Sequence, residues 1–164
     1  MFNQVRRFGL TAAMLTLLLT VLAACGGSAG ASPESRVDSF IKDINSAFND
    51  KDIANEAKQE EWADKLSKYF LPAEQATQKA EVKEALAGMG SIPGMSIKIE
   101  NAKVEKVSET GDNAEVKLVS GTMVMEAAGQ KQEQNLAETG LVGGGSDNVK
   151  LQKVDGTWYI LSNN

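Results

Sequence analysis

Residues 149–161, Val-Lys-Leu-Gln-Lys-Val-Asp-Gly-Thr-Trp-Tyr-Ile-Leu, carry the clearest structural signal of the chain. Apolar and polar side chains alternate on both sides of Asp155-Gly156. An Asp-Gly pair between two alternating runs is typical of a two-residue β-hairpin, because both central residues of that turn need a positive φ. The sequence therefore predicts two antiparallel strands, at residues 149–154 and 157–161, that close the chain.

The same alternation continues upstream of this hairpin. Between Ile97 and Val104 the apolar positions change face once, which indicates a β-bulge near Asn101. Turn-forming residues follow at 110–113, and Gly129 is a plausible next turn. Further strands are predicted to begin at Ile97 and to cover residues 114–125 and, with a more polar composition, 131–142.

The residues before the sheet have the spacing of helices. From Val37 to Phe48, apolar residues recur at i, i+3, i+4 and i+7, and Ser32 followed by Pro33 suits an N-cap and a first helical residue. Two more helices are predicted, at 53–70 and 73–87, before a Gly-rich loop at 88–94. The chain is thus expected to form one α+β domain, with three helices packed on a curved antiparallel sheet of four to five strands.

The N-terminal residues have a different composition. A basic segment, Met1–Arg7, precedes an apolar run from Leu10 to Leu22, and small residues lead to Cys25. This order is typical of a secretory signal peptide, and the run is short for a membrane span, although an uncleaved transmembrane anchor is the alternative. The Gly, Ala and Ser residues that follow Cys25 predict a flexible tether.

The four residues Leu22, Ala23, Ala24 and Cys25 resemble a lipobox, the cleavage and lipidation sequence of bacterial lipoproteins. The resemblance implies that residues 1–24 are removed as a signal peptide. It also implies that the Cys25 thiol receives a diacylglycerol and that the new amino group can be acylated, for example with palmitate. Residues 25–32 would then be the lipidated cysteine and its tether, and residues 33–164 a folded domain held outside the cytoplasm on a bacterial membrane.

Charge and composition narrow the function. Loss of Arg6 and Arg7 with the signal changes the formal net charge from −5 to −7. Such a surface repels nucleic-acid phosphates and anionic lipids, so we expect no nucleic-acid partner and membrane attachment through the lipid alone. The chain has no histidine, the commonest general base and metal ligand, and we predict no metal, no cofactor and no enzymatic activity.

Three N-terminal helices, a bulged sheet and a closing hairpin with the pattern Asp155-Gly156-x-Trp158 resemble the nuclear transport factor 2-like (cystatin-like) superfamily. Within it, the chain is similar to small bacterial lipoproteins with lumazine-binding-type domains of unknown function. The resemblance covers about residues 34–162 and implies a cone-shaped pocket between helices and sheet. The residues that would line this pocket, or fill the core instead, are Phe40, Ile44, Phe48, Trp62, Phe70, Val116, Leu118, Trp158 and Ile160.

Enzymes of that superfamily place an acid–base pair inside the cone. The candidates here are Asp43, Glu61, Asp64, Tyr69 and Tyr159. The carboxylates fall on the polar sides of their helices, where we expect solvated side chains with no catalytic tuning. The two tyrosines are expected to pack their rings and leave their hydroxyls in water.

The methionines permit two interpretations. Met123 and Met125, with Met89 and Met95, offer thioethers that suit Cu(I), but methionine more often fills gaps in a core. Val119, Gly121, Met123 and Met125 are expected on the outer face of the sheet. That face is apolar enough to indicate a covered surface, such as a homodimer contact.

Together these observations predict a non-catalytic, membrane-anchored extracytoplasmic module that binds a small apolar ligand or another envelope protein. An interaction module with a solid core is the alternative, and an enzyme with a buried carboxylate is a third hypothesis. A cavity above about 300 Å³ would favour ligand binding over the solid-core alternative.

Overall fold

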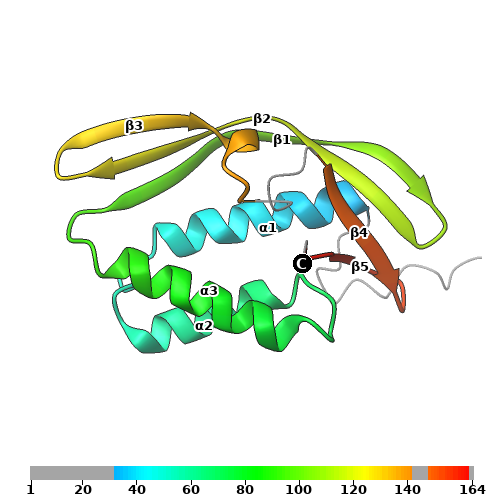
Figure 1. Ribbon diagram of the computed structural model, residues 1–164, viewed down its shortest axis with the longest axis horizontal. Helices are drawn as coiled ribbons and strands as arrows, with labels where there is room; N and C mark the ends of the chain where they lie inside the picture. The colour runs from blue at the N-terminus through cyan, green and yellow to red at the C-terminus, as the bar shows by residue number, and fades with distance from the viewer. Residues whose placement is uncertain (1–31, 142–147, 163–164) are drawn as a thin grey trace, which may run out of the picture.

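The computed structural model describes residues 32–141 and 148–162. The helices are α1 (Pro33–Phe48), α2 (Glu56–Ser67) and α3 (Gln75–Gly90). The strands are β1 (Ser96–Thr110), β2 (Asn113–Ala127), β3 (Gln130–Asn135), β4 (Asn148–Val154) and β5 (Thr157–Ile160), with a short 3₁₀ helix, η1 (Leu136–Glu138), after β3. All strand pairs are antiparallel in the order β1-β2-β4-β5, and β3 pairs with the other half of β2. Figure 1 shows the helices on one side of the bent sheet, which confirms the predicted α+β class.

The first helix begins where the sequence indicates. Ser32 Oγ accepts a hydrogen bond from the Ser35 N–H, Pro33 is the first helical residue, and the apolar stripe that includes Val37 and Ile44 is buried against the sheet. None of the helices in the described residues has the length and apolar content that a bilayer crossing requires.

The second and third helices differ from the predicted ranges for local reasons. α2 begins later than residue 53 because Asn55 caps it, accepting from the Ala57 N–H. It ends before residue 70 because the chain turns there to let Tyr69 accept a backbone hydrogen bond from Ile160. α3 continues through Gly90, where a Cβ atom would lie 3.0 Å from Ala54 Cα, so the close approach of two backbones favours glycine.

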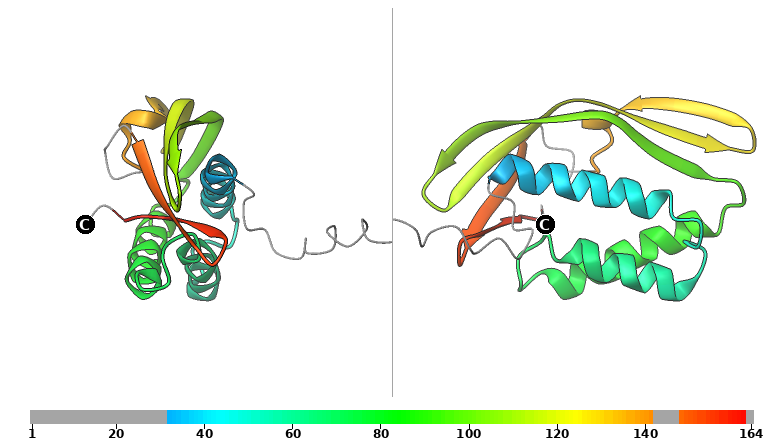
Figure 2. Two further views of the ribbon diagram at one scale, coloured as in Figure 1. Left: turned by 90° about the vertical axis from the view of Figure 1, so that its right-hand side faces the viewer. Right: turned by 180° about the vertical axis from the view of Figure 1, so that it is seen from behind.

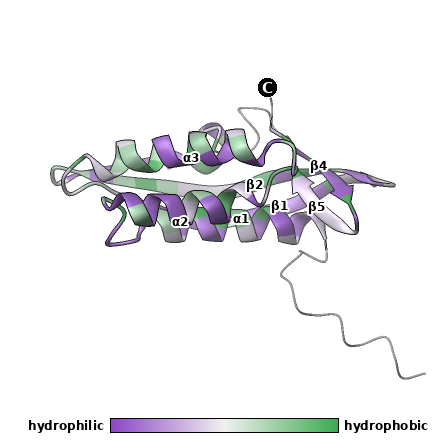
Figure 3. Cartoon of the chain, turned by 90° about the horizontal axis from the view of Figure 1, so that it is seen from below, coloured by the Kyte–Doolittle hydropathy of each residue, from purple (hydrophilic) through white to green (hydrophobic). Residues whose placement is uncertain are grey.

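Ion pairs hold α2 and α3 together on their solvent side. Lys79 pairs with Glu60 and Asp64, and Lys83 pairs with Glu56 and Glu60. Seen from the helix side, Figure 3 shows hydrophilic residues along both helices. These charges are solvated, as the spacing of acidic and basic residues indicates.

The turns and the bulge of the sheet agree with the sequence. The β1–β2 register shifts between Glu100 and Lys103, and Asn101 has a φ of 54°, so the predicted bulge is confirmed. Asp155 and Gly156 both have positive φ, as the predicted hairpin requires. β3, however, ends at Asn135 rather than near residue 142, because the Asn135 side chain accepts from the Ala137 N–H and starts η1.

The prediction that Met123 and Met125 lie on the outer face is wrong. They stand opposite Ile99 and Ile97 in the β1–β2 register, and both isoleucines are buried, so the methionines share the inner face. Val116 and Leu118 also point to that face, although they are even-numbered and the two methionines are odd-numbered. The face therefore changes near Gly121, which has a φ of 151° and is covered by Leu136 of η1. Val119 remains exposed.

Two parts of the sheet differ in their surroundings. β2 pairs with β4 over Asn113–Lys117 and with β3 over Thr122–Ala127. We call β3, Thr122–Ala127 and Ser96–Glu100 the arm, and the helices with the rest of the sheet the body. Figure 1 shows the tip of the arm extending past the end of α1.

Candidate functional site

The proposed lipidation site lies outside the described residues. Leu22, Ala23, Ala24 and Cys25 precede Ser32, the first residue that the structure describes. Cleavage of residues 1–24 and lipidation of Cys25 therefore stay predictions from the sequence.

The nine residues proposed for a pocket come together between the helices and the sheet. Seven of them belong to the buried hydrophobic core: Phe40, Ile44, Phe70, Val116, Leu118, Trp158 and Ile160. Phe48 and Trp62 are partly buried and pack against that core. Three aromatic rings contact one another in this core, with Phe40 at centroid distances of 5.3 and 5.4 Å from Tyr69 and Phe70.

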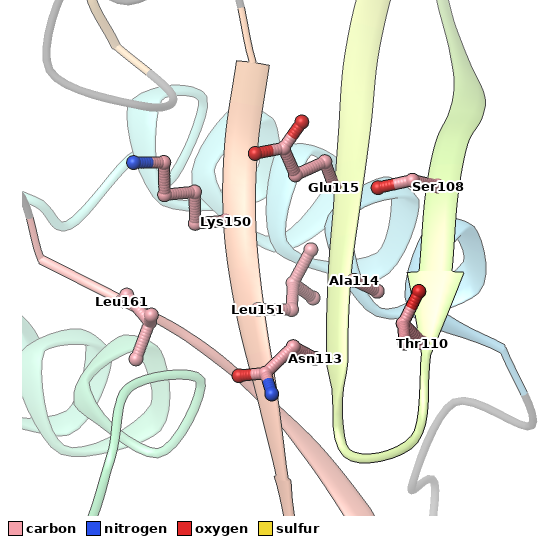
Figure 4. A pocket seen from close by; sticks show the side chains of 8 residues that line it. All are labelled: Ser108, Thr110, Asn113, Ala114, Glu115, Lys150, Leu151 and Leu161. Carbon is pink, nitrogen blue, oxygen red and sulfur yellow. The ribbon is translucent and has the colours of Figure 1, made fainter.

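Two surface pockets of the described residues are lined by other side chains. The first, about 180 Å³, lies where β1, β2 and β4 meet, and Figure 4 shows Ser108, Glu115 and Lys150 around it with Leu151 between them. This volume is below the roughly 300–1,000 Å³ of typical small-molecule sites. The second, about 460 Å³, is an open groove along residues 119–122 of β2 and 133–135 of β3.

A buried cation, Arg36, was missed by the sequence reasoning. Its guanidinium lies 4.2 Å from the centre of the Tyr69 ring and 5.6 Å from that of Tyr159, and its Nη2 donates to the Lys68 carbonyl. Burial lowers the pKa of this guanidinium from its ordinary value. The signal was present in the sequence, because Arg36 precedes Phe40 by one helical turn and so falls at the edge of the apolar stripe.

The hydroxyl of Tyr69 is not in water, contrary to prediction. It donates to Asp43 Oδ2 at 2.7 Å, and Lys65 Nζ pairs with Asp43 Oδ1 at 2.8 Å. Burial, with the hydrogen bond to Asp43, raises the pKa of Tyr69 above its ordinary value. The hydroxyl therefore stays protonated near neutral pH and acts as a hydrogen-bond donor, not as a base.

The other catalytic candidates are dispersed. Glu61 and Asp64 form exposed ion pairs with Lys58 and Lys79. Both carboxylates are therefore solvated, as predicted. Among the described residues, no three His, Cys, Asp or Glu side chains gather where they could hold a metal ion. The partly buried Met123 packs against the hydrophobic core.

Asp50 is a further polar contact at the edge of the core. Its Oδ2 accepts from the indole N–H of Trp62 at 2.8 Å, and this hydrogen bond lowers the pKa of the Asp50 carboxyl. The bond joins the turn after α1 to α2, so Trp62 is held by both packing and polarity.

Comparison with known proteins adds distant structural likenesses. No family model and no curated protein matches the sequence. The chain is similar to a structure described as an NTF2-like transpeptidase from Campylobacter jejuni, with 18% identity, a TM-score of 0.35, and 80% of this chain and 99% of that chain covered. It is also similar to one described as a scytalone dehydratase from Novosphingobium aromaticivorans, with 17% identity, a TM-score of 0.40, and 77% and 75% covered. Because both TM-scores are below 0.5, these likenesses carry no weight for the fold. The α+β assignment depends on the order of the helices and the register of the strands described above.

Proposed function

We propose that this chain is a lipid-anchored extracytoplasmic protein whose folded domain binds another protein and does not enclose a small ligand. The observation that carries the proposal is the burial of the residues that were expected to line a pocket. Seven of the nine residues that would line a cone-shaped pocket are buried against one another in the core. A small apolar ligand would have to displace these side chains, at a cost of core packing.

The surface pockets support the same proposal. The smaller is below the size of typical ligand sites, and the larger is open along the sheet. An open groove beside a strand is better suited to an extended segment of another protein than to an enclosed molecule.

The anchor part of the proposal is tested by labelling cells that express the full chain with an alkyne analogue of palmitate. We expect label in the wild type and none in Cys25→Ala, which should also migrate as the uncleaved precursor. A wild-type protein that still begins at Met1, or equal labelling of Cys25→Ala, would contradict the lipid anchor.

The binding part is tested by native mass spectrometry of the full chain extracted gently from membranes. We expect no bound small molecule beyond the covalent lipid. A stoichiometric small molecule that is lost in a Leu118→Trp variant, whose larger side chain would occupy any cavity beside Leu118, would favour the ligand-binding hypothesis instead.

A further inference from the structure

β3 is an open edge of the sheet within the described residues. It pairs with β2 along one side, and all six of its residues, Gln130–Asn135, are exposed. The edge formed by Ser96–Glu100 of β1 is different, because Asn45 accepts from the Ile99 N–H and Asn49 donates to the Ile97 carbonyl. β5 is also covered, since its Ile160 N–H donates to the Tyr69 carbonyl. Figure 2 shows β3 and α1 on opposite sides of β2.

The turn before β3 determines which backbone groups face this open edge. Ala128 and Gly129 both have positive φ, so they form a two-residue turn closed by the pair Ala127–Gln130. Such a closing pair exchanges both backbone hydrogen bonds, and hydrogen-bonded pairs alternate along an antiparallel ladder. The backbone groups of Lys131 and Glu133 therefore point away from β2, toward the open edge.

The sequence of β3, Gln-Lys-Gln-Glu-Gln-Asn, is complementary to itself when reversed. We propose that two copies of this chain pair antiparallel through β3, about a two-fold axis at Gln132. Lys131 of each copy then stands opposite Glu133 of the other, and the same two residues supply the free backbone donors and acceptors. Glutamines occupy the remaining facing positions.

Charge selects this register over its neighbours. An axis at Lys131 would place the two lysines opposite each other, and an axis at Glu133 would do the same with the two glutamates. Like charges directly opposite destabilise a strand pair, whereas opposite charges stabilise it. Within each copy Lys131 Nζ already pairs with Glu133 Oε1 at 2.7 Å, so the dimer exchanges two exposed ion pairs, one in each copy, for two across the edge. The charges therefore determine the register of the pair more than its strength.

The expected dimer is a weak one in dilute solution. A six-residue edge buries less surface than the roughly 1,200–2,000 Å² of stable interfaces. Anchoring both copies in one membrane raises their effective concentration without any new contact. In this respect the inference rests on the proposed function, of which it names one partner, a second copy of the chain.

The register is tested by cysteine cross-linking of the full chain in membranes under mild oxidation. Gln132→Cys places two thiols on the axis, where facing Cβ atoms lie about 4.5–5.5 Å apart, close enough to form a disulfide. Gln134→Cys is the matched control, because the two residues at 134 lie four positions apart along the strands, about 13 Å. We expect at least five-fold more disulfide-linked dimer from Gln132→Cys than from Gln134→Cys.

Charge variants in the Gln132→Cys background give an independent readout. Glu133→Lys places lysines opposite each other twice and should lower cross-linking about five-fold. Adding Lys131→Glu restores both opposite-charge pairs and should restore cross-linking. All of these positions are exposed, and circular dichroism of each variant verifies that it folds.

Equal cross-linking at 132 and 134, or cross-linking that Glu133→Lys leaves unchanged, would overturn the register. No cross-linking of Gln132→Cys in protein that carries the palmitate label would overturn the dimer while leaving the lipid anchor intact. The wild-type chain separates the two proposals. A wild-type chain that forms a disulfide dimer through Cys25 and carries no palmitate label would contradict the lipid anchor. The proposed pairing through β3 would not be affected by that result.

Discussion

The two halves of β2 have the same regular pairing but very different surroundings. In the half that pairs with β4, Ala114 and Val116 are buried under the helices, and so is the adjoining Leu118. In the half that pairs with β3, Thr122–Ala127, every residue keeps some exposure to solvent. The body is thus stabilised by packing, and in the arm Ile97 and Ile99 are also buried. β3, whose six residues are all exposed, depends mainly on its pairing with β2, and an exposed strand of this kind can accept another strand at little cost.

The largest effect is expected at Gly121, where the two halves join. A Cβ atom there would lie 2.9 Å from Leu136 Cδ2, at a φ of 151° that other residues rarely adopt. We expect Gly121→Ala to lower the free energy of unfolding by about 3 kcal/mol, from collision and backbone strain together. Urea unfolding followed by tryptophan fluorescence measures this.

Gly129→Ala is the matched control for that variant. Gly129 also has a positive φ, of 77°, but nothing within 4 Å of its Cβ position. Its substitution should cost only about 1–2 kcal/mol, from strain alone. An equal loss in the free energy of unfolding for the two variants would mean that the close contact between residue 121 and Leu136 adds nothing to the backbone strain.

Two valines of β2 compare a buried inner position of the body with a partly exposed outer position of the arm. Val116 is fully buried in the body, and Val124 is partly exposed in the arm. Val116→Ala should cost about 2 kcal/mol through lost transfer energy and a residual cavity. Val124→Ala should cost about 0.5 kcal/mol, mostly from reduced strand propensity. Similar losses in urea unfolding would contradict the distinction between body and arm.

Tyr69→Phe tests the polar contact inside the body. Loss of the hydrogen bond to Asp43 should cost about 1 kcal/mol near neutral pH. Because the folded state raises the pKa of Tyr69, the stability linked to its proton is present below the ordinary tyrosine pKa of about 10 and is lost as the pH rises further.

The measurement is the free energy of unfolding of both proteins from pH 8 to 11. The wild type should lose its advantage over Tyr69→Phe above about pH 10. A difference between the two proteins that stays constant over this range would show that the hydroxyl has no raised pKa in the folded state.

The smallest effect is expected where α1 holds the arm. Asn45→Ala removes the acceptor for the Ile99 N–H, so the amides of residues 96–100 should exchange with solvent about five-fold faster, with body amides unchanged. Ser46→Ala, on the exposed side of the same helix, is the control. Faster exchange in both variants would point to a general loss of helix stability.

Local signals in the sequence were sufficient for much of the fold. Ser32-Pro33, the face change near Asn101 and Asp155-Gly156 each act within a few residues, so a helix start, a bulge and a hairpin could be predicted from them. The face of Met125 could not, because it depends on the change of face near Gly121, which Leu136 covers from fifteen residues away in the chain.

The sequence was sufficient to predict which residues lie in the interior, but not whether they surround a cavity. Residues such as Phe40 and Trp158 were identified as interior from their periodicity, which records burial. Whether such residues surround a cavity depends on how their volumes fill the interior, and periodicity carries no information about that. Arg36 was overlooked because a charge at the stripe's edge is usually solvated, whereas here two tyrosine rings cover it.

The direction of α1 determines how a pair of these proteins would lie on a membrane. α1 begins at the β4–β5 end of the sheet and ends beneath the arm, so the described part of the chain starts at the end of the long axis opposite the arm. In the proposed antiparallel pair the two α1 helices would begin at opposite ends. If Cys25 carries the proposed lipid, residues 26–32, at most about 25 Å of chain, would join that lipid to each helix. Both anchors can enter one leaflet only when the long axis lies flat along the bilayer, with the two-fold axis upright. A dimer of this chain would therefore lie parallel to the membrane surface, with one lipid attachment at each end of its long axis.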